Sequence, residues 1–191
     1  GGGGPPRPCW QSPANTTMKP WEKTGQEVVY DGRLKVVKKT FRRPDGRLAT
    51  FEVRDTLDVV CILAVTTEGR ILFARQFRPG LEEVMLDLPG GFMDSGETPE
   101  QSARRELREE TGYEAGEIRF LAANPVSAYA NNRRHNFLAT GCRKVGAPQN
   151  QDQEECEVVE LSLDEFKARL RGGNLTDIGS GFLGLDALKL L

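Results

Sequence analysis

Both ends of one helix are marked in the sequence, near the middle of the chain. Thr98 suits the N-cap, Pro99 suits the first helical position, and Gln101 completes a Thr-x-x-Gln capping box. Gly112 suits the C-terminal cap, because glycine adopts the left-handed backbone conformation there without strain. The pattern predicts a helix from Pro99 to Thr111, preceded by an irregular, glycine-rich loop.

The predicted helix carries three closely spaced glutamates, Glu106, Glu109 and Glu110. At about 100° per residue their side chains share an arc of about 100° that borders the apolar side of the helix. Carboxylates held this close raise one another's pKa and cost stability unless positive charge lies among them. A hard divalent cation such as Mg²⁺, completed by substrate phosphates, meets that need. The alternative is a solvated helix face with i,i+4 ion pairs, for example Arg105 with Glu109.

Strand patterns surround this helix. Glu27–Val53 predicts short antiparallel strands joined by turns with Asp-Gly pairs, and residues 57–79 predict two longer strands joined by a turn. Further strands follow the helix, and two C-terminal helices are expected to begin near Leu163 and near Leu175. Strands and helices without strict alternation indicate an α+β fold.

We expect three segments along the chain. Residues 1–17 are rich in Gly and Pro and lack the apolar stretch of a signal peptide, so they are interpreted as a disordered leader or a tag remnant. Residues 18–55 form a small N-terminal β region that buries little surface alone and is expected to pack on the main domain or on a second subunit. Residues 56–191 form the main domain.

Composition excludes several classes of function. The 191 residues carry a formal net charge of -2, so there is no large basic field for non-specific binding of nucleic acid. No apolar run approaches the roughly 20 residues that span a bilayer. The chain has four cysteines without a CxxC pair and one histidine, which argues against a zinc finger and favours a reducing, cytoplasmic setting.

The segment from residue 91 to residue 113 resembles the Nudix box, G-x5-E-x7-R-E-U-x-E-E-x-G-U, where U is a bulky aliphatic residue. Every fixed position of the box is matched, and only Tyr113, at the last U, departs from the usual type. The matching residues are Gly91, Glu97, Arg105, Glu106, Glu109, Glu110 and Gly112.

The rest of the chain resembles the ADP-ribose/nucleoside-diphosphate-sugar pyrophosphatase branch of that family. The shared features are the N-terminal strands, "QFRP" and "DLPGG" before the box, and an acidic loop after it. The resemblance implies a mixed β-sheet between helices (α/β/α) with a small N-terminal antiparallel β region. It also implies a homodimer, because relatives exchange the N-terminal region between subunits.

The resemblance implies hydrolysis of a nucleoside diphosphate sugar, such as ADP-ribose, to a nucleoside monophosphate and a sugar phosphate. The reaction would depend on Mg²⁺ or Mn²⁺, held by Glu106, Glu109, Glu110 and the main-chain carbonyl of Gly90. Besides binding metal, Glu109 is a candidate catalytic residue.

The catalytic base is expected in the acidic loop after the box, as in this branch of the family. Alignment of the loop with relatives favours Glu154, with Glu155 next. The alternative for either residue is a solvated acidic loop. Arg105 and Glu97 are expected to fix each other and the loop of the box.

Four residues are candidates for substrate binding: Arg78, Phe51, Asn132 and His135. Arg78 would clamp the diphosphate, or else is a surface arginine after an edge strand. Phe51 would stack on the nucleobase or pack within its strand. Asn132 and His135 would hydrogen-bond ribose, sugar or phosphate, and the alternative for His135 is a place where a turn enters a strand.

Other substrates and roles stay open. ADP-ribose pyrophosphatases often have a proline about 16 residues after the box, where this chain has Tyr129. GDP-sugars, other nucleoside diphosphate sugars and dinucleoside polyphosphates are therefore alternatives. A nucleoside triphosphate hydrolase is another, although such relatives usually lack the N-terminal region. A non-catalytic nucleotide-binding module is the last, although such modules usually lose the box glutamates.

Overall fold

The computed structural model describes residues 18–149 and 155–191. Contacts along the backbone divide the chain into two units, with the boundary between Asp55 and Thr56. No helix in the described residues is long and apolar enough to cross a membrane.

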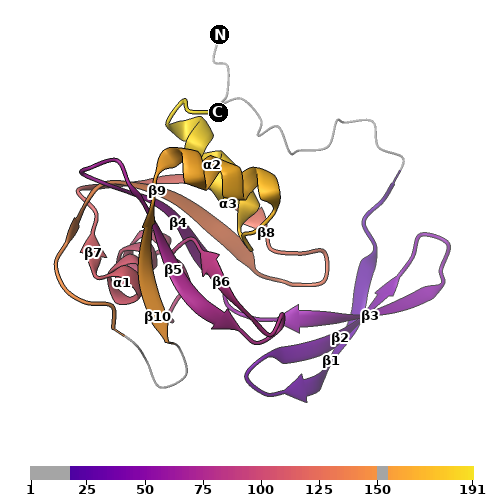
Figure 1. Ribbon diagram of the computed structural model, residues 1–191. Helices are drawn as coiled ribbons and strands as arrows, with labels where there is room; N and C mark the ends of the chain where they lie inside the picture. Colours follow the sequence, from indigo (N-terminus) through magenta and orange to yellow (C-terminus); the bar gives the residue numbers. More distant parts are fainter. Residues whose placement is uncertain (1–17, 150–154) are drawn as a thin grey trace, which may run out of the picture. The chain divides into compact units, whose positions relative to one another are not determined.

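The N-terminal unit is an antiparallel sheet with the strand order β1-β2-β3, which confirms the expected N-terminal β region (Figure 1). Its side chains are mostly exposed in β1 and half-buried in β2, where Val37 is fully buried. Three aromatic rings lie together here: Phe51 is 6.2 Å from Trp21 and 6.1 Å from Phe41 between ring centroids. The strands are β1 (Glu22–Asp31), β2 (Lys35–Arg42) and β3 (Leu48–Asp55).

The second unit is built on a seven-stranded mixed sheet with the path β10-β5-β4-β9-β7, to which β6 adds beside β5 and β8 beside β9. β4 and β9 run parallel, and the other pairs are antiparallel. The strands are β4 (Val59–Thr66), β5 (Ile71–Arg78), β6 (Glu83–Asp87), β7 (Tyr113–Glu114), β8 (Glu117–Pro125), β9 (Arg133–Lys144) and β10 (Cys156–Leu161).

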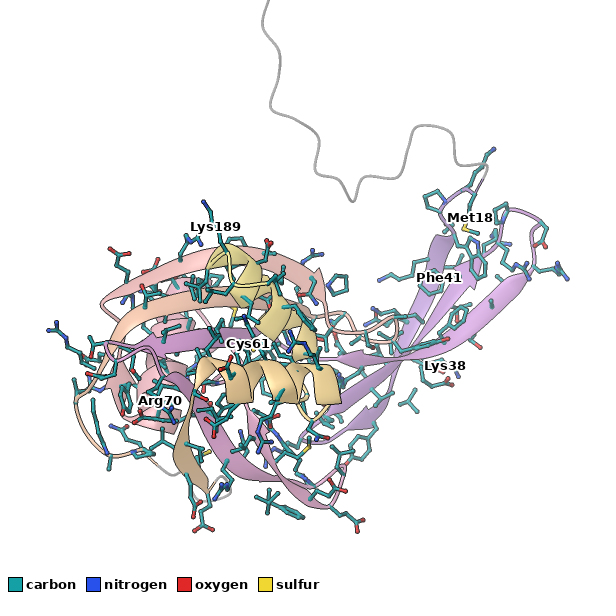
Figure 2. The ribbon with its side chains drawn as sticks, turned by 45° about the horizontal axis from the view of Figure 1, so that its top comes forward. Met18, Lys38, Phe41, Cys61, Arg70 and Lys189 are labelled. Carbon is teal, nitrogen blue, oxygen red and sulfur yellow. The ribbon has the colours of Figure 1, made fainter. Side chains whose placement is uncertain are left out.

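Alternating residues of β4 and β5 feed two apolar clusters, one on each face of this sheet. Ile62 and Leu72 belong to the cluster that includes Leu107 of α1. Cys61 and Phe73 belong to the cluster of α2 and α3, where Figure 2 labels Cys61 close to these helices. Helices therefore cover both faces, as expected for an α/β/α sandwich. They are α1 (Pro99–Thr111), α2 (Leu163–Gly172) and α3 (Ile178–Ala187).

The limits predicted for α1 are confirmed. The Thr98 hydroxyl accepts a hydrogen bond from the Gln101 amide at 3.3 Å, and the Gln101 side chain accepts one from the Thr98 amide at 2.8 Å. Gly112 has a φ of 74°, and a Cβ there would lie 2.4 Å from the carbonyl oxygen of Gly146. Glycine is thus required twice, by the backbone conformation and by the close neighbour.

Three features differ from the sequence interpretation. The short strands β6 and β7 were not expected. β10 begins at Cys156, within a segment interpreted as part of an acidic loop, and its pairing with β5 decides its conformation. α3 begins at Ile178, three residues later than Leu175; in the segment before it, Leu175 packs in the core and the Thr176 side chain bonds to Asp87.

Candidate active site

A cavity of about 340 Å³ opens beside α1, between the end of β5, the loop that precedes the helix and the start of β10. Five residues predicted from the sequence as metal or substrate ligands line it: Arg78, Gly90, Glu106, Glu109 and Glu110. The other lining residues are Gln76, Gly91, Phe92, Asp94, Arg105, Gln149 and Cys156.

The carboxyl group of Glu110 is buried beside the cavity. Its side chain accepts hydrogen bonds from the Gly90 amide at 2.8 Å and from the Gln76 side chain at 3.4 Å. Burial raises the pKa of Glu110 to about 8, against the effect of the Gly90 hydrogen bond, and the negative charge of Glu106 raises it further. A positive charge in the cavity would therefore stabilise the ionised form of this carboxyl group.

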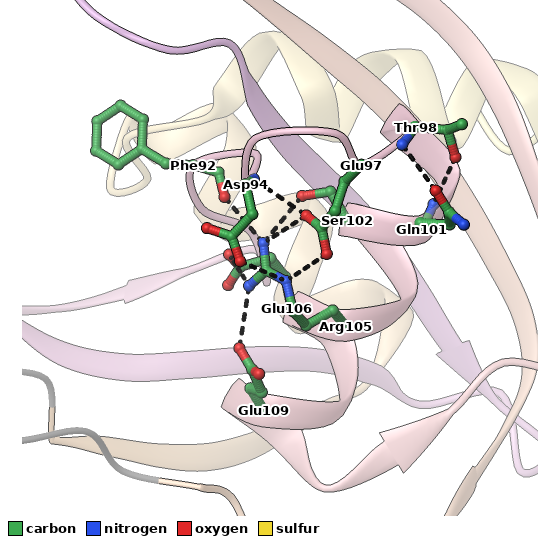
Figure 3. Close-up of polar contacts among 9 residues, drawn as sticks. All are labelled: Phe92, Asp94, Glu97, Thr98, Gln101, Ser102, Arg105, Glu106 and Glu109. Carbon is green, nitrogen blue, oxygen red and sulfur yellow. Dashed lines mark hydrogen bonds and ion pairs between the residues drawn. The ribbon is translucent and has the colours of Figure 1, made fainter.

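Glu106 and Glu109 share one partner, Arg105, as Figure 3 shows. Nη1 of Arg105 donates to Glu106 at 2.8 Å and to Glu109 at 3.1 Å. The i,i+4 ion pair weighed in the sequence interpretation therefore exists, but the helix face that carries it lines a cavity.

The other side of the Arg105 guanidinium holds the loop before the helix (Figure 3). Nε and Nη2 donate to the two carboxylate oxygens of Glu97 at 2.9 and 3.0 Å, and Nη2 also donates to the Phe92 carbonyl at 3.0 Å. The hydrogen bonds from Arg105 lower the pKa of Glu97 to about 2. Arg105 and Glu97 thus fix each other and the loop, as expected.

The oxygen donors beside α1 fit a hard divalent cation. A Cβ at Gly91 would lie 2.6 Å from an oxygen of Glu106, so a larger residue there would clash with this carboxylate. A Cβ at Gly90 would lie 2.2 Å from the carbonyl oxygen of Val60, so glycine is needed in this conformation too. No group of three or more His, Cys, Asp or Glu side chains in the described residues is already arranged to hold a metal ion. Glu106 and Glu109 would have to turn from Arg105 toward the cation.

Arg78 lines the cavity, and 35% of its side-chain surface is exposed. It ends β5, which is flanked by β6 and β10, so the alternative of a surface arginine after an edge strand is not what the structure shows. Its Nε donates to Oδ2 of Asp87 at 2.5 Å.

Asn132 and His135 are not among the residues that line the cavity. The Asn132 amide donates to the Leu57 carbonyl at 2.9 Å, and Nε2 of His135 lies 2.8 Å from Oδ2 of Asp58. Asp58 also accepts from the amide of Arg133 at 2.8 Å. These contacts tie the start of β9 to the start of β4, which gives both residues a structural role. A contact with substrate stays a prediction.

The remaining predicted residues lie elsewhere. Phe51 belongs to the N-terminal unit, where it packs with other aromatic side chains, and its contact with a nucleobase stays a prediction. Glu154 lies outside the described residues. Glu155 is exposed and directly precedes Cys156, which lines the cavity.

The sequence interpretation missed Gln76, Cys156 and Asp87. Gln76 is 7% exposed and holds Glu110, and Asp87 is fully buried and holds Arg78. The signal for Gln76 was its place in β5, two residues before Arg78 and therefore on the same face. Asp87 was visible only as a member of "DLPGG".

Comparisons with known proteins agree with this geometry. Residues 55–176 match the NUDIX domain family. The chain is 34% identical over 148 residues to an ADP-ribose pyrophosphatase of Bacillus subtilis, covering 75% of this chain and 80% of that protein. It is 32% identical over 142 residues to a methanol dehydrogenase activator of Bacillus methanolicus, covering 73% and 77%.

A solved structure has the same fold. The crystal structure of an ADP compounds hydrolase superposes with a TM-score of 0.77 at 20% identity, covering 92% of this chain and 97% of that chain. The family match spans α1, the loop before it and the cavity that both line. The chain is a member of the NUDIX family.

Proposed function

We propose that this protein hydrolyses the diphosphate bond of a nucleoside diphosphate sugar, with ADP-ribose as the first substrate to test and Mg²⁺ as the cofactor. The observation that carries the proposal is the cavity itself. It places the guanidinium of Arg78 and the buried carboxyl group of Glu110 on one surface, together with the other box glutamates. Cation and anion sites side by side suit a diphosphate that is bound together with metal.

The residues have separate roles in the proposed reaction. Glu106, Glu109, Glu110 and the carbonyl of Gly90 would hold Mg²⁺. A bound divalent cation neutralises phosphate oxygens and lowers the pKa of a coordinated water. Arg78 presents N–H donors to the diphosphate. A carboxylate from the loop after the box removes the proton of the attacking water, with Glu154 favoured over Glu155.

The names of the relatives support a diphosphate substrate and leave one alternative. The Bacillus subtilis relative is named for ADP-ribose hydrolysis, whereas the Bacillus methanolicus relative is named as an activator of another enzyme. All the box glutamates are present in this chain, which favours hydrolysis over a purely regulatory module.

A substrate panel tests the proposal. Nucleoside diphosphate sugars, nucleoside triphosphates and dinucleoside polyphosphates are incubated with Mg²⁺, and the products are identified by mass. We expect AMP and ribose 5-phosphate from ADP-ribose. Glu106→Gln and Glu110→Gln should each remove nearly all turnover, whereas Glu100→Gln, on the exposed side of the same helix, should not. Full activity in either of the first two variants would refute the metal-ligand assignment.

We also propose that the protein is a homodimer through its N-terminal unit. The support is that this small sheet exposes Val28, Val29, Tyr30 and Leu48, and that a sheet of three strands with few buried side chains has little stability of its own. Light scattering coupled to size exclusion gives the mass directly, and a monomer at micromolar concentration would contradict the proposal. A cytoplasmic location stays a prediction from the cysteine pattern.

A further inference from the structure

The Arg78 guanidinium is held at one nitrogen, Nε, by the carboxylate of Asp87. The side chain reaches back along β5, because Arg78 pairs across the sheet with Glu83 whereas Asp87 pairs with Ala74. Among the described residues, the hydrogen bond recorded for the Arg78 guanidinium is the one from Nε to Asp87. The two terminal nitrogens, which form the fork that recognises a phosphate, are left for the cavity.

Asp87 is itself held by hydrogen bonds from Thr176, which lies far from it in the sequence. Its side chain is fully buried, and Oδ1 accepts a hydrogen bond from the Thr176 hydroxyl at 2.7 Å and a longer one from the Thr176 amide at 3.4 Å. Thr176 lies in the segment that leads into α3. The carboxylate therefore has one oxygen on Arg78 and the other on the C-terminal part of the fold.

The neighbouring carboxylate has a different partner. Asp177 is buried, and its Oδ1 lies 2.7 Å from Nη2 of Arg134, so its ion pair is with Arg134 and not with Arg78. Burial of a charge without a partner costs several kcal/mol, which explains why each of the two aspartates has its own arginine. The two aspartates meet at Thr176, whose hydroxyl lies 2.7 Å from Oδ1 of Asp87 and 3.1 Å from Oδ2 of Asp177, but Asp87 is the one that pairs with Arg78.

We propose that Asp87, braced by Thr176, is a positioning residue that aims the Arg78 guanidinium at the diphosphate of the substrate. This inference rests on the proposed function, since it takes the diphosphate to bind at Arg78. An arginine side chain loses much rotamer freedom when it binds a phosphate, and a buried partner that has already fixed Nε removes part of that cost. Asp87 itself does not touch the substrate.

The kinetic test uses Asp87→Asn, which keeps the size of the side chain but removes its charge, and Thr176→Val, which removes the hydroxyl. We expect Asp87→Asn to lower kcat/KM for ADP-ribose on the order of 10-fold to 100-fold, as small displacements of a binding group do. Thr176→Val should lower it less. Ser180→Ala is the matched control, because it removes a buried hydroxyl in α3 that bonds to Asn136 instead. It should lower stability without changing kcat/KM.

A double-mutant cycle separates positioning from general destabilisation. If Asp87 acts through Arg78, Asp87→Asn should change kcat/KM by no more than about twofold in an Arg78→Ala background. An equal loss in both backgrounds, or a loss of kcat/KM in Ser180→Ala as large as that in Asp87→Asn, would overturn the proposal.

A measurement without turnover makes the outcome independent of the proposed activity. The ¹⁵N and ¹H resonances of the Arg78 Nε–H group report its hydrogen bond in the substrate-free protein. We expect slow solvent exchange for this proton in the wild type and fast exchange in Asp87→Ala, which has no side-chain acceptor for Nε, whereas Ser180→Ala should match the wild type. Protection that survives in Asp87→Ala would refute the positioning role. If the wild type shows the protection but hydrolyses none of the nucleoside diphosphate sugars of the panel, the proposed function is refuted instead.

Discussion

Replacement of Glu110 by Gln should stabilise the metal-free protein, and the gain should depend on pH. The folded state raises the pKa of Glu110 from the ordinary value of 4.5 to about 8. Between those pH values the folded protein binds more protons than the unfolded chain, so stability falls as pH rises. Glutamine keeps the shape of the side chain and an acceptor for the Gly90 amide, but it has no charge to bury.

The size of the effect follows from the shift in pKa. Each pH unit between the two pKa values costs the wild type about 1.4 kcal/mol of stability. At pH 7.5, about three units above the unfolded pKa, the cost is therefore at most about 4 kcal/mol. Relaxation of the site and entry of water reduce this, and we expect the variant to be more stable than the wild type by about 2 kcal/mol at that pH. Below pH 4.5 the difference should vanish.

Urea unfolding in EDTA at pH 4.5, 6, 7 and 8 measures the difference directly. Glu100→Gln is the control, because its carboxylate is exposed and pairs with Arg104 on the same helix surface. Its difference from the wild type should be small and nearly flat with pH. A flat difference for Glu110→Gln as well would show that burial of the charge is not the cause, and would refute the reasoning. Added Mg²⁺ should stabilise the wild type more than Glu110→Gln.

Four further outcomes are expected. Glu154→Gln should lower kcat strongly with little change in metal binding by calorimetry, and a larger loss in Glu155→Gln would show that the alignment of the loop is off by one. Gly91→Ala should displace Glu106 and weaken metal binding by at least tenfold in the same titration. Thr98→Ala should cost about 1 kcal/mol in urea unfolding through loss of the N-cap, with kcat/KM unchanged. Phe73→Ala should cost about 3–5 kcal/mol, because this fully buried ring packs edge-on against α2, and a loss below about 1 kcal/mol would contradict that packing.

Local sequence rules were enough to predict α1 and the loop that precedes it. A capping box and a C-terminal glycine act over a few residues, so the sequence alone set the limits of the helix. The same holds for β4 and β5, whose apolar runs and turn glycine are visible in the chain. β10 was harder to predict, because its conformation depends on pairing with β5, whose residues lie 80 to 90 positions earlier in the chain.

The candidate site divides in the same way. Glu106, Glu109 and Glu110 were found because the helix period places them together, and Arg105 with Glu97 because the spacing of the box does so. His135 and Asn132 were chosen for their chemistry alone. Their partners, Asp58 and Leu57, lie more than seventy residues earlier in the chain, so no local sequence pattern predicts these contacts.

The sequence by itself determined the family, the capped helix and the cluster of carboxylates, because each depends on residues within one short segment. The tertiary structure decided what those carboxylates experience. It buried Glu110 against Gly90 and Gln76 and turned Glu106 and Glu109 toward Arg105. It also paired Arg78 with Asp87, which Thr176 holds from the other side. Burial and charge depend on elements that meet only when the chain is folded, and the pKa of a carboxyl group follows from them.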